Sequence, residues 1–376
     1  MINKENLPLK GIRVLDLCIV LAGPTCGRTL AQYGAEVIKI DPEHRPPSLT
    51  PWLDVGRGKK SICLNITKPG GLNVFLKMAN TADVIIDGFR KGVTKKLGID
   101  YQTLSKNNPR LIYGSINCFG HNGPWKSRPG FEQNAQAATG IQIRNGGANL
   151  KPRQATFTLN DYGTGLAAAY GIILALLERN KTGFGQEIEA SLVSTSTMLS
   201  AGLSVDYDGY QKTDIGGPGL RGSSINNRLY ETQNGWIFVN VSLEKLWGKL
   251  LLQNKKNRSE IEKLFLKNTT EHWLNILSKI GIQAVKHVVS DDIYSNVYNH
   301  ERGMIVTKHY SPKTWGTATW SGNPVSVSNA RQPSILPQKF GEDTIQILTD
   351  LGISQSEINF LQISGAIPRK LPISLS

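Results

Sequence analysis

The sequence predicts an α/β fold, with a large doubly wound, Rossmann-like domain and a smaller α/β domain. The stretch from Gly11 to Val20 is a β-branched run, followed by a Gly-Pro turn, a segment with helical spacing and a second strand pattern that ends at Asp41. Strand, helix and strand in this order form a βαβ unit, which favours a parallel sheet. The alternation continues with strand patterns at 61–66, 82–89 and 110–120 and helical patterns at 70–80 and 92–99.

The composition changes at residues 206–227, which are rich in glycine and serine. Such a stretch predicts a long loop or linker. Beyond it, residues 236–241 predict a strand, and residues 242–252 and 272–282 predict helices of the smaller domain. The chain from Pro337 predicts two amphipathic helices.

The net charge indicates an anionic partner. The 376 residues carry 43 Lys and Arg against 29 Asp and Glu, a formal charge of +14. No lysine-arginine block, zinc knuckle or aromatic RNA-binding signature accompanies it, so we expect no nucleic-acid partner. The charge fits a solvated basic surface or a small molecule that bears phosphates.

The same composition sets expectations about metals, membranes and location. The four cysteines form no C-x-x-C pair, so we expect reduced thiols and no metal. The longest apolar run, Gly165 to Leu177, is shorter than the roughly 20 residues that span a membrane. We therefore expect no membrane partner, and without a signal-peptide pattern a cytoplasmic location.

Asp161 is the residue whose surroundings most strongly indicate chemistry. It precedes a Gly-Thr-Gly step, and no charged residue lies between Gly165 and Leu177. One interpretation is a helix N-cap. The other is a reactive carboxylate: Gly163 and Gly165 would let a ligand approach, and a helix apolar on every face predicts burial. We expect the helix N-terminus to keep the carboxylate ionised, as a nucleophile towards an activated acyl group.

Long collinear segments of the chain resemble the class III CoA-transferases, the formyl-CoA and carnitine CoA-transferase type. The signature around Asp161 covers residues 159–186, and the opening segment, 9–41, resembles the start of the same family. Further similar segments are 56–66, 82–99, 108–140 and 340–353. The resemblance therefore extends over nearly the whole chain, unlike a lone glycine motif.

The resemblance implies an enzyme that moves CoA between an acyl-CoA donor and a carboxylic acid acceptor. Asp161 would form an aspartyl anhydride and then an aspartyl-CoA thioester, with coenzyme A as co-substrate and no metal. It also implies a homodimer of interlocked ring-shaped subunits. The large CoA-binding domain would comprise residues 1–195 and 325–376, and the small domain with its linkers 196–324.

Further site residues follow from the resemblance. Positions near the substrate are Leu21, Ala22 and Glu132, with Gly216 and Gly217 in a glycine-rich loop that is either a lid or an ordinary linker. Glu132 is alternatively a buried partner of a neighbouring lysine or arginine. Positions that match CoA-binding residues are Val20, Arg57, Lys59, Lys60, Phe89 and Lys96; each lysine is alternatively a solvated surface side chain.

Departures from the family pattern bear on the identity of the substrate more than on the binding of CoA. Gly88 replaces the usual asparagine before Phe89, Lys91 replaces a proline, and Pro42 replaces an arginine that meets the adenosine end in some relatives, where Arg45 could supply charge. Related α-methylacyl-CoA racemases need a histidine where this chain has Phe131, which ranks a racemase-like isomerase second. A non-catalytic acyl-CoA or acyl-carrier binding protein is the third interpretation.

Overall fold

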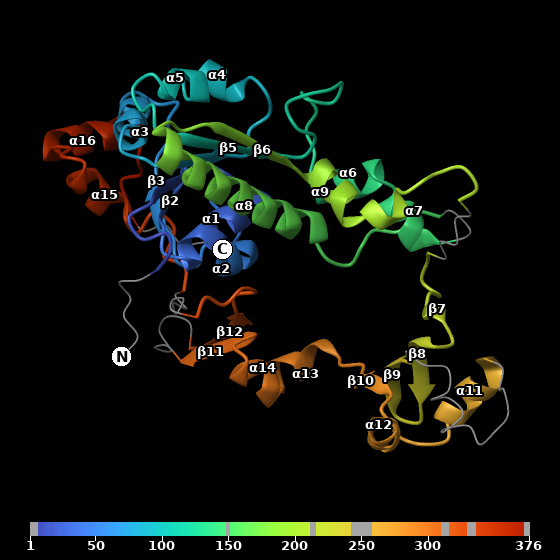
Figure 1. Cartoon of the computed structure of the whole chain (residues 1–376). Helices are drawn as coiled ribbons and strands as arrows, with labels where there is room; N and C mark the ends of the chain where they lie inside the picture. The colour runs from blue at the N-terminus through green and yellow to red at the C-terminus, as the bar shows by residue number, and fades with distance from the viewer. Residues whose placement is uncertain are drawn as a thin grey trace. The chain divides into compact units, whose positions relative to one another are not determined.

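The computed structural model describes residues 7–147, 151–210, 216–241, 258–309, 316–328 and 336–371. The chain forms two compact units (Figure 1). The first comprises Met1–Gln142, Gln154–Asp208 and Trp320–Ser376, and the second comprises Ile143–Arg153 and Gly209–Thr319.

A six-stranded parallel sheet organises the first unit, in the order β3-β2-β1-β4-β5-β6. Its strands are β1 (Arg13–Asp16), β2 (Glu36–Asp41), β3 (Lys60–Cys63), β4 (Val84–Asp87), β5 (Ile112–Asn117) and β6 (Glu187–Ser191). The strand order reverses between β1 and β4. In open parallel sheets, ligands bind beyond the carboxyl ends of the strands at such a reversal.

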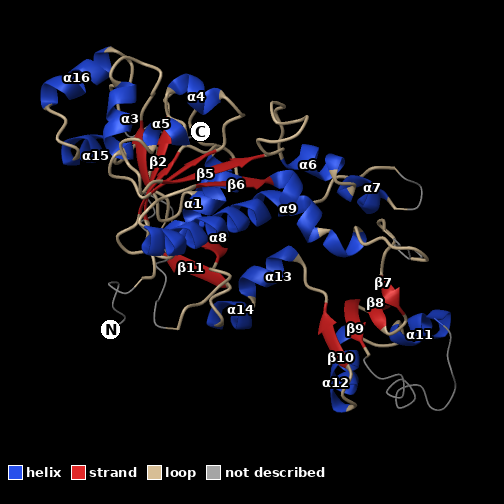
Figure 2. Ribbon diagram, turned by 45° about the horizontal axis from the view of Figure 1, so that its top comes forward, coloured by secondary structure: helices blue, strands red, loops and turns tan. Residues whose placement is uncertain are grey.

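Helices pack on both faces of this sheet (Figure 2). The helices of the first unit are α1 (Ala22–Gln32), α2 (Leu49–Val55), α3 (Gly71–Ala79), α4 (Val93–Leu97), α5 (Tyr101–Leu104), α6 (Glu132–Ala138), α8 (Leu159–Thr182), α9 (Leu192–Leu199), the short 3-10 helix η2 (Ala201–Leu203), α15 (Thr344–Asp350) and α16 (Gln355–Ile363). Helix α7 (Ile141–Gly146) begins in the first unit and continues into the second. Alternate residues of β1 divide between two cores, because successive side chains of a strand point to opposite faces. Leu15 packs with α3, α15 and α16, whereas Val14 packs with α1 and α8.

Glycines allow α8 to lie close against its helical neighbours. A Cβ on Gly165 would lie 2.5 Å from the Ala22 carbonyl oxygen and 2.6 Å from Cβ of Thr25, both in α1. A Cβ on Gly163 would meet Thr195 of α9 at 3.0 Å. The interpretation that these two glycines leave room for a ligand is therefore wrong, because their open sides face other helices.

Gly165→Ala is expected to destabilise the protein by about 1–3 kcal/mol, because the added methyl would overlap the backbone of α1. The matched control is Gly171→Ala in the same helix, whose Cβ would meet only Ile188 Cδ1 at 3.6 Å. The free energy of unfolding of that control should increase by about 0.5–1 kcal/mol, because alanine has a higher helix propensity than glycine. Urea unfolding measures both changes, and equal midpoints for the two variants would contradict the packing argument.

One face of α8 is exposed, so the expectation of a fully buried helix is wrong. Leu166, Tyr170, Leu174 and Leu177 are 42–65% exposed, although the opposite face is buried against α1 and the sheet. An all-round apolar pattern predicts that a helix is covered on every side, but the pattern does not say that its own chain supplies every covering surface.

The second unit contains a four-stranded antiparallel sheet in the order β10-β9-β8-β7. Its elements are β7 (Gly222–Ser224), β8 (Asn227–Thr232), β9 (Gly235–Asn240), α11 (Arg258–Phe265), α12 (Thr270–Lys279), β10 (Gln283–Lys286), α13 (Ser290–Ser295) and α14 (Val297–Glu301). A further pair follows, β11 (Ile305–His309) and β12 (Thr317–Ser321). The predicted strand at 236–241 is β9 and the predicted helix at 272–282 is α12, whereas the helix predicted at 242–252 lies outside the described residues.

The chain returns to the first unit after β12 and is held there by hydrogen bonds from three side chains. Arg57 donates to the Ser321 carbonyl at 3.0 Å, Tyr33 to that of Val325 at 2.7 Å and Trp52 to that of Gln338 at 2.9 Å. The two predicted C-terminal helices are α15 and α16, and their side chains complete one of the two sheet cores.

Candidate active site

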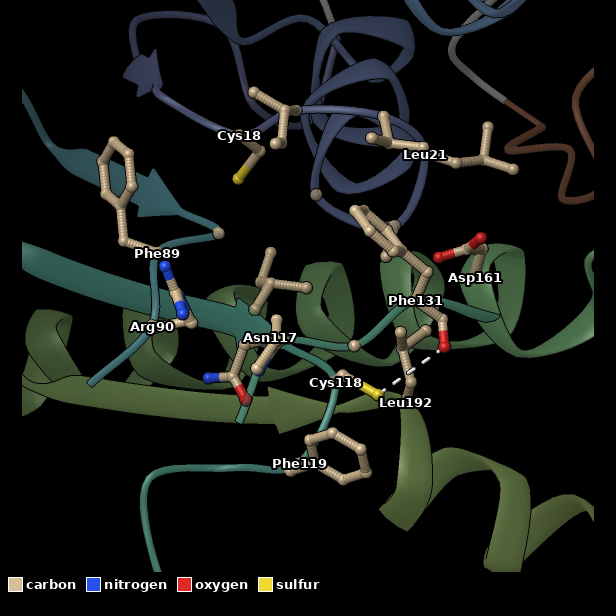
Figure 3. A pocket seen from close by; sticks show the side chains of 18 of the residues that line it. Cys18, Leu21, Phe89, Arg90, Asn117, Cys118, Phe119, Phe131, Asp161 and Leu192 are labelled. Atoms are coloured by element: carbon tan, nitrogen blue, oxygen red, sulfur yellow. Dashed lines mark hydrogen bonds between the residues drawn. The ribbon is translucent and has the colours of Figure 1, made fainter. Parts of the chain in front are cut away.

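A pocket of about 450 Å³ lies where the loops after β1, β4 and β5 meet (Figure 3). The β1–α1 loop contributes Ile19 to Ala22, the turn after β4 contributes Phe89 and Arg90, and the end of β5 contributes Asn117 to Phe119. Asp161 from α8 and Leu192 from α9 also line it. The pocket thus lies at the reversal of strand order, where parallel sheets bind ligands.

Asp161 is the third residue of α8, after the N-cap Thr158, so it is not the helix cap. The residue is 8% exposed and lines the pocket. Within the described ranges, no hydrogen bond or ion pair engages its carboxylate. Its side chain is therefore buried, acidic and available to a ligand.

Glu132, the first residue of α6, satisfies the backbone at the start of α8. One oxygen accepts the Asp161 N–H at 2.8 Å, and the other accepts the backbone N–H of Asn160 at 3.3 Å and its amide at 3.0 Å. Gln136 donates to the same carboxylate at 2.8 Å. Glu132 is 2% exposed and its partners are these amides rather than a lysine or arginine. It therefore fixes the first turn of the helix that carries Asp161.

Burial, and then the nearby Glu132 charge, raise the pKa of Asp161 to about 7. The expectation that the helix N-terminus favours the ionised form is therefore opposed by desolvation and by the second carboxylate, which raise the pKa and leave the group partly protonated near neutral pH. A carboxylate with a pKa near neutrality is poorly hydrated and is a stronger nucleophile than one in water.

A second set of contacts, independent of Glu132, holds the start of α8. Tyr162 donates its hydroxyl to Asp54 at 2.8 Å. The other Asp54 oxygen accepts from Arg28 at 2.6 Å and from Arg57 at 2.7 Å. Asp161 thus lies in a helical turn anchored through its own backbone and through its neighbour's side chain.

The structure brings together some of the residues that the sequence singled out. Val20, Leu21, Ala22 and Phe89 line the same pocket as Asp161. Val20 has φ +66°, the only positive value for a non-glycine residue in the described part of the chain. A β-branched residue is strained in that conformation, and such strain is typical of functional loops.

The basic loop at 57–60 is occupied by internal partners. Lys59 has a fully buried side chain and bonds Asp16 at 2.7 Å and the Pro24 carbonyl at 2.8 Å. Arg57 pairs with Asp54, and Lys60 with Glu36 at 2.6 Å. These side chains do not line the pocket, so the loop stabilises the unit instead of presenting charges to it.

Two further groups of predicted residues lie away from the pocket lining. Lys96 belongs to α4. Gly216 and Gly217 belong to the second unit, where a Cβ would lie 2.4 Å from the Arg144 carbonyl oxygen and 2.6 Å from Gly147 Cα, respectively.

Four pocket cations are absent from the predicted site: Arg45, Arg90, Lys126 and Arg128. Of these, the sequence indicates only Arg45, as a replacement charge beyond the second strand. The signals for the others are local: Arg90 directly follows Phe89, and Lys126 and Arg128 lie in the Gly- and Pro-containing loop before Glu132. These side chains supply the positive charge that phosphate groups require.

Among the described residues, no group of three or more His, Cys, Asp and Glu side chains is arranged to hold a metal ion. No helix in the same part of the chain has the length and apolarity needed to cross a bilayer.

Comparisons with known proteins place these features in a family context. The model of CoA-transferase family III matches residues 9–344. The chain is 35% identical over 274 residues to the succinyl-CoA–L-malate CoA-transferase β subunit of Chloroflexus aurantiacus, covering 68% of this chain and 66% of that protein. It is 30% identical to the α-methylacyl-CoA racemase of Mus musculus, covering 93% of this chain and 95% of the racemase. The crystal structure of a CAIB/BAIF family protein from Brucella suis superposes with a TM-score of 0.81 at 26% identity, covering 92% of this chain and 100% of that one.

Proposed function

Because the chain belongs to CoA-transferase family III, we propose that it transfers CoA from an acyl-CoA donor to a carboxylic acid acceptor, with Asp161 as the nucleophile. The observation that carries the proposal is the buried Asp161 carboxylate, which lines a pocket that also contains four cationic side chains. An activated acyl group could meet the carboxylate while the phosphates of CoA meet the cations.

The proposed reaction exchanges one activated acyl bond for another. The Asp161 carboxylate attacks the thioester carbonyl and expels CoA thiolate, which leaves a mixed anhydride. The thiolate then attacks the aspartyl carbonyl, releasing the donor acid and forming an aspartyl-CoA thioester. The acceptor carboxylate displaces CoA from that thioester, and the thiolate attacks the new acyl group, which regenerates the Asp161 carboxylate. No ATP is consumed, since every step conserves an activated acyl bond.

Features of the site support this chemistry. Leu21, Phe131 and Leu192 line the pocket with Asp161 and would limit access of water, which hydrolyses anhydrides. The first amides of α1 adjoin the pocket at Ala22 and Gly23, and a helix N-terminus stabilises developing negative charge.

The arrangement of domains and subunits belongs to the same proposal. The first unit would be the CoA-binding domain, with bounds near 1–195 plus 325–376, and Gly216 and Gly217 would act from the second. The protein would be a homodimer, a proposal that the exposed apolar face of α8 supports. A cytoplasmic location would suit the four buried free cysteines.

An α-methylacyl-CoA racemase is the second candidate, favoured by the similarity to that enzyme over most of both chains. Phe131 speaks against it, since its ring cannot accept a proton at the position of the racemase histidine. The pocket residue that could take a proton is Asp161, and a two-base racemase needs a partner for it.

Trapping with hydroxylamine separates the two candidates. With a donor acyl-CoA and no acceptor acid, a transferase should accumulate an aspartyl anhydride or thioester, which hydroxylamine converts to a hydroxamate at Asp161. Mass spectrometry of a peptide that spans Thr158 to Arg179 detects the adduct. Incorporation of solvent deuterium at the α-carbon of a 2-methylacyl-CoA, without any hydroxamate, would instead identify a racemase.

A further inference from the structure

The charged side chains of the pocket are one carboxylate and four cations. Asp161 is the one acidic side chain among the described residues that line it, and Arg45, Arg90, Lys126 and Arg128 are the cations. Arg90 lies beside Phe89, across the pocket from Asp161 (Figure 3). A thioester with a phosphate at Arg90 and its reacting carbonyl at Asp161 would therefore carry its acyl group on the side away from Arg90.

Apolar side chains line the part of the pocket where Asp161 lies. In Figure 3, Leu21, Phe131 and Leu192 lie on the same side of the pocket as Asp161. Phe131 is 54% exposed, so a large part of its ring is available to a ligand. Cys118, whose thiol lies 3.6 Å from the Phe131 carbonyl oxygen, has 5% exposure and a pKa raised by burial first and then by Asp161, which keeps it neutral.

The electrostatic surroundings of Asp161 agree with this lining. Burial and the Glu132 charge both raise its pKa, and no positive charge from the described residues opposes them. An acyl group with a second carboxylate would bring a third negative charge to this region. It would be desolvated against apolar side chains with no cation beside it, which is strongly unfavourable.

We propose that the acyl groups handled at this site are uncharged and apolar next to the reacting carbonyl, as in aliphatic or aromatic monocarboxylic acids, and that Phe131 is a specificity-determining residue for them. This inference rests on the proposed CoA transfer. It sets the chain apart from its relatives named for succinyl-CoA, whose acyl group carries a distal carboxylate.

Self-exchange of matched acids tests the inference without an acceptor of unknown identity. Butyryl-CoA is incubated with isotopically labelled butyrate, and succinyl-CoA with labelled succinate. The two acyl groups have equal chain length and differ at the terminal group. Mass spectrometry of the thioesters gives each rate, and we expect kcat/KM for butyryl exchange to be at least about 10-fold higher.

Two variants at one exposed position localise the preference. Phe131→Arg places a cation beside Asp161. It should lower the ratio of kcat/KM for butyryl exchange to kcat/KM for succinyl exchange by about 10-fold. Phe131→Leu, the matched control, keeps an apolar side chain and should retain the preference. An unchanged ratio in Phe131→Arg would overturn the role of Phe131.

Binding to the non-reacting Asp161→Asn variant, measured by calorimetry, separates the inference from the proposed function. Tighter binding of butyryl-CoA than of succinyl-CoA supports the inference even where turnover is absent. Equal or reversed affinities overturn it. Exchange of succinate as fast as butyrate would overturn the acyl preference while leaving the transferase proposal intact, whereas absence of exchange for both acids would overturn the transferase proposal.

Discussion

Asp161→Asn is expected to lower the rate of CoA exchange by at least about 10⁴-fold, because the variant retains the shape of the carboxyl group but cannot form the anhydride. The hydroxamate at Asp161 should disappear in parallel. Initial rates of thioester exchange, measured under substrate saturation, give the loss in kcat. Binding of CoA should change little, since the substitution removes none of the four pocket cations, and Arg90 lies across the pocket from Asp161.

The control for this variant is Asp83→Asn. Asp83 pairs with Arg179 of α8 at 2.9 Å and its side chain is 27% exposed, so it is an anchored acidic residue of the same unit outside the pocket. We expect its exchange rate to stay within about threefold of the wild type, because no reacting group is removed. A rate for Asp161→Asn within tenfold of the wild type would remove Asp161 from the nucleophilic role.

The same Asp161→Asn variant is expected to increase stability at alkaline pH. The pKa of Asp161 is raised from 3.8 to about 7 in the folded protein. The stability contributed by the protonated carboxyl is fully present below about pH 4 and is lost as the pH rises to about 7. The amide that replaces the carboxyl stays neutral at every pH, so the free energy of unfolding of the variant should exceed that of the wild type by up to about 4 kcal/mol at pH 8 and by little at pH 4.

Unfolding in urea at several pH values measures this gap. It should open between about pH 4 and 7 and remain constant above that range. In a Glu132→Gln background the gap should shrink, because the second cause of the raised pKa has been removed. A gap that is as large at pH 4 as at pH 8 would show that the gain comes from packing rather than from ionisation.

Much of the fold followed from hydrophobic patterns. The βαβ unit at 11–41 is β1, α1 and β2. The strand pattern at 61–66 overlaps β3, and those at 82–89 and 110–120 contain β4 and β5. β6 was missed because its sequence, EIEAS, alternates charged and apolar residues at the edge of the sheet and directly follows a long helix. Strand β1 ends at Asp16, earlier than its pattern, since residues 17–21 leave the sheet and Val20 adopts a left-handed conformation.

Some residues of the site were predicted from the sequence and others were not, and the difference has a physical cause. The family resemblance predicted Leu21 and Ala22 near the substrate, and they line the pocket with Asp161, whereas Leu192 was not predicted. A loop after a strand and a helix start can reach the same edge of a parallel sheet. The cations could not be placed from the sequence, since their role depends on long-range pairing. Lys59 and Arg57 are taken up by Asp16 and Asp54 from other segments, whereas Arg90 and Arg128 reach the pocket. No local pattern distinguishes a lysine that neutralises a buried aspartate from one that meets a ligand.

The return of the chain to the first unit after β12 affects how this protein is made. The sheet face that Ile38, Ile62 and Phe75 occupy is completed by α15 and α16, which follow it by about 270–320 residues of synthesis. During translation that face stays open while the larger segment of the second unit, Gly209–Thr319, is synthesised, because this segment precedes Trp320–Ser376 of the first unit in the sequence. The nascent chain is therefore expected to present an uncovered apolar surface for many seconds at ordinary elongation rates, the kind of surface that chaperones bind.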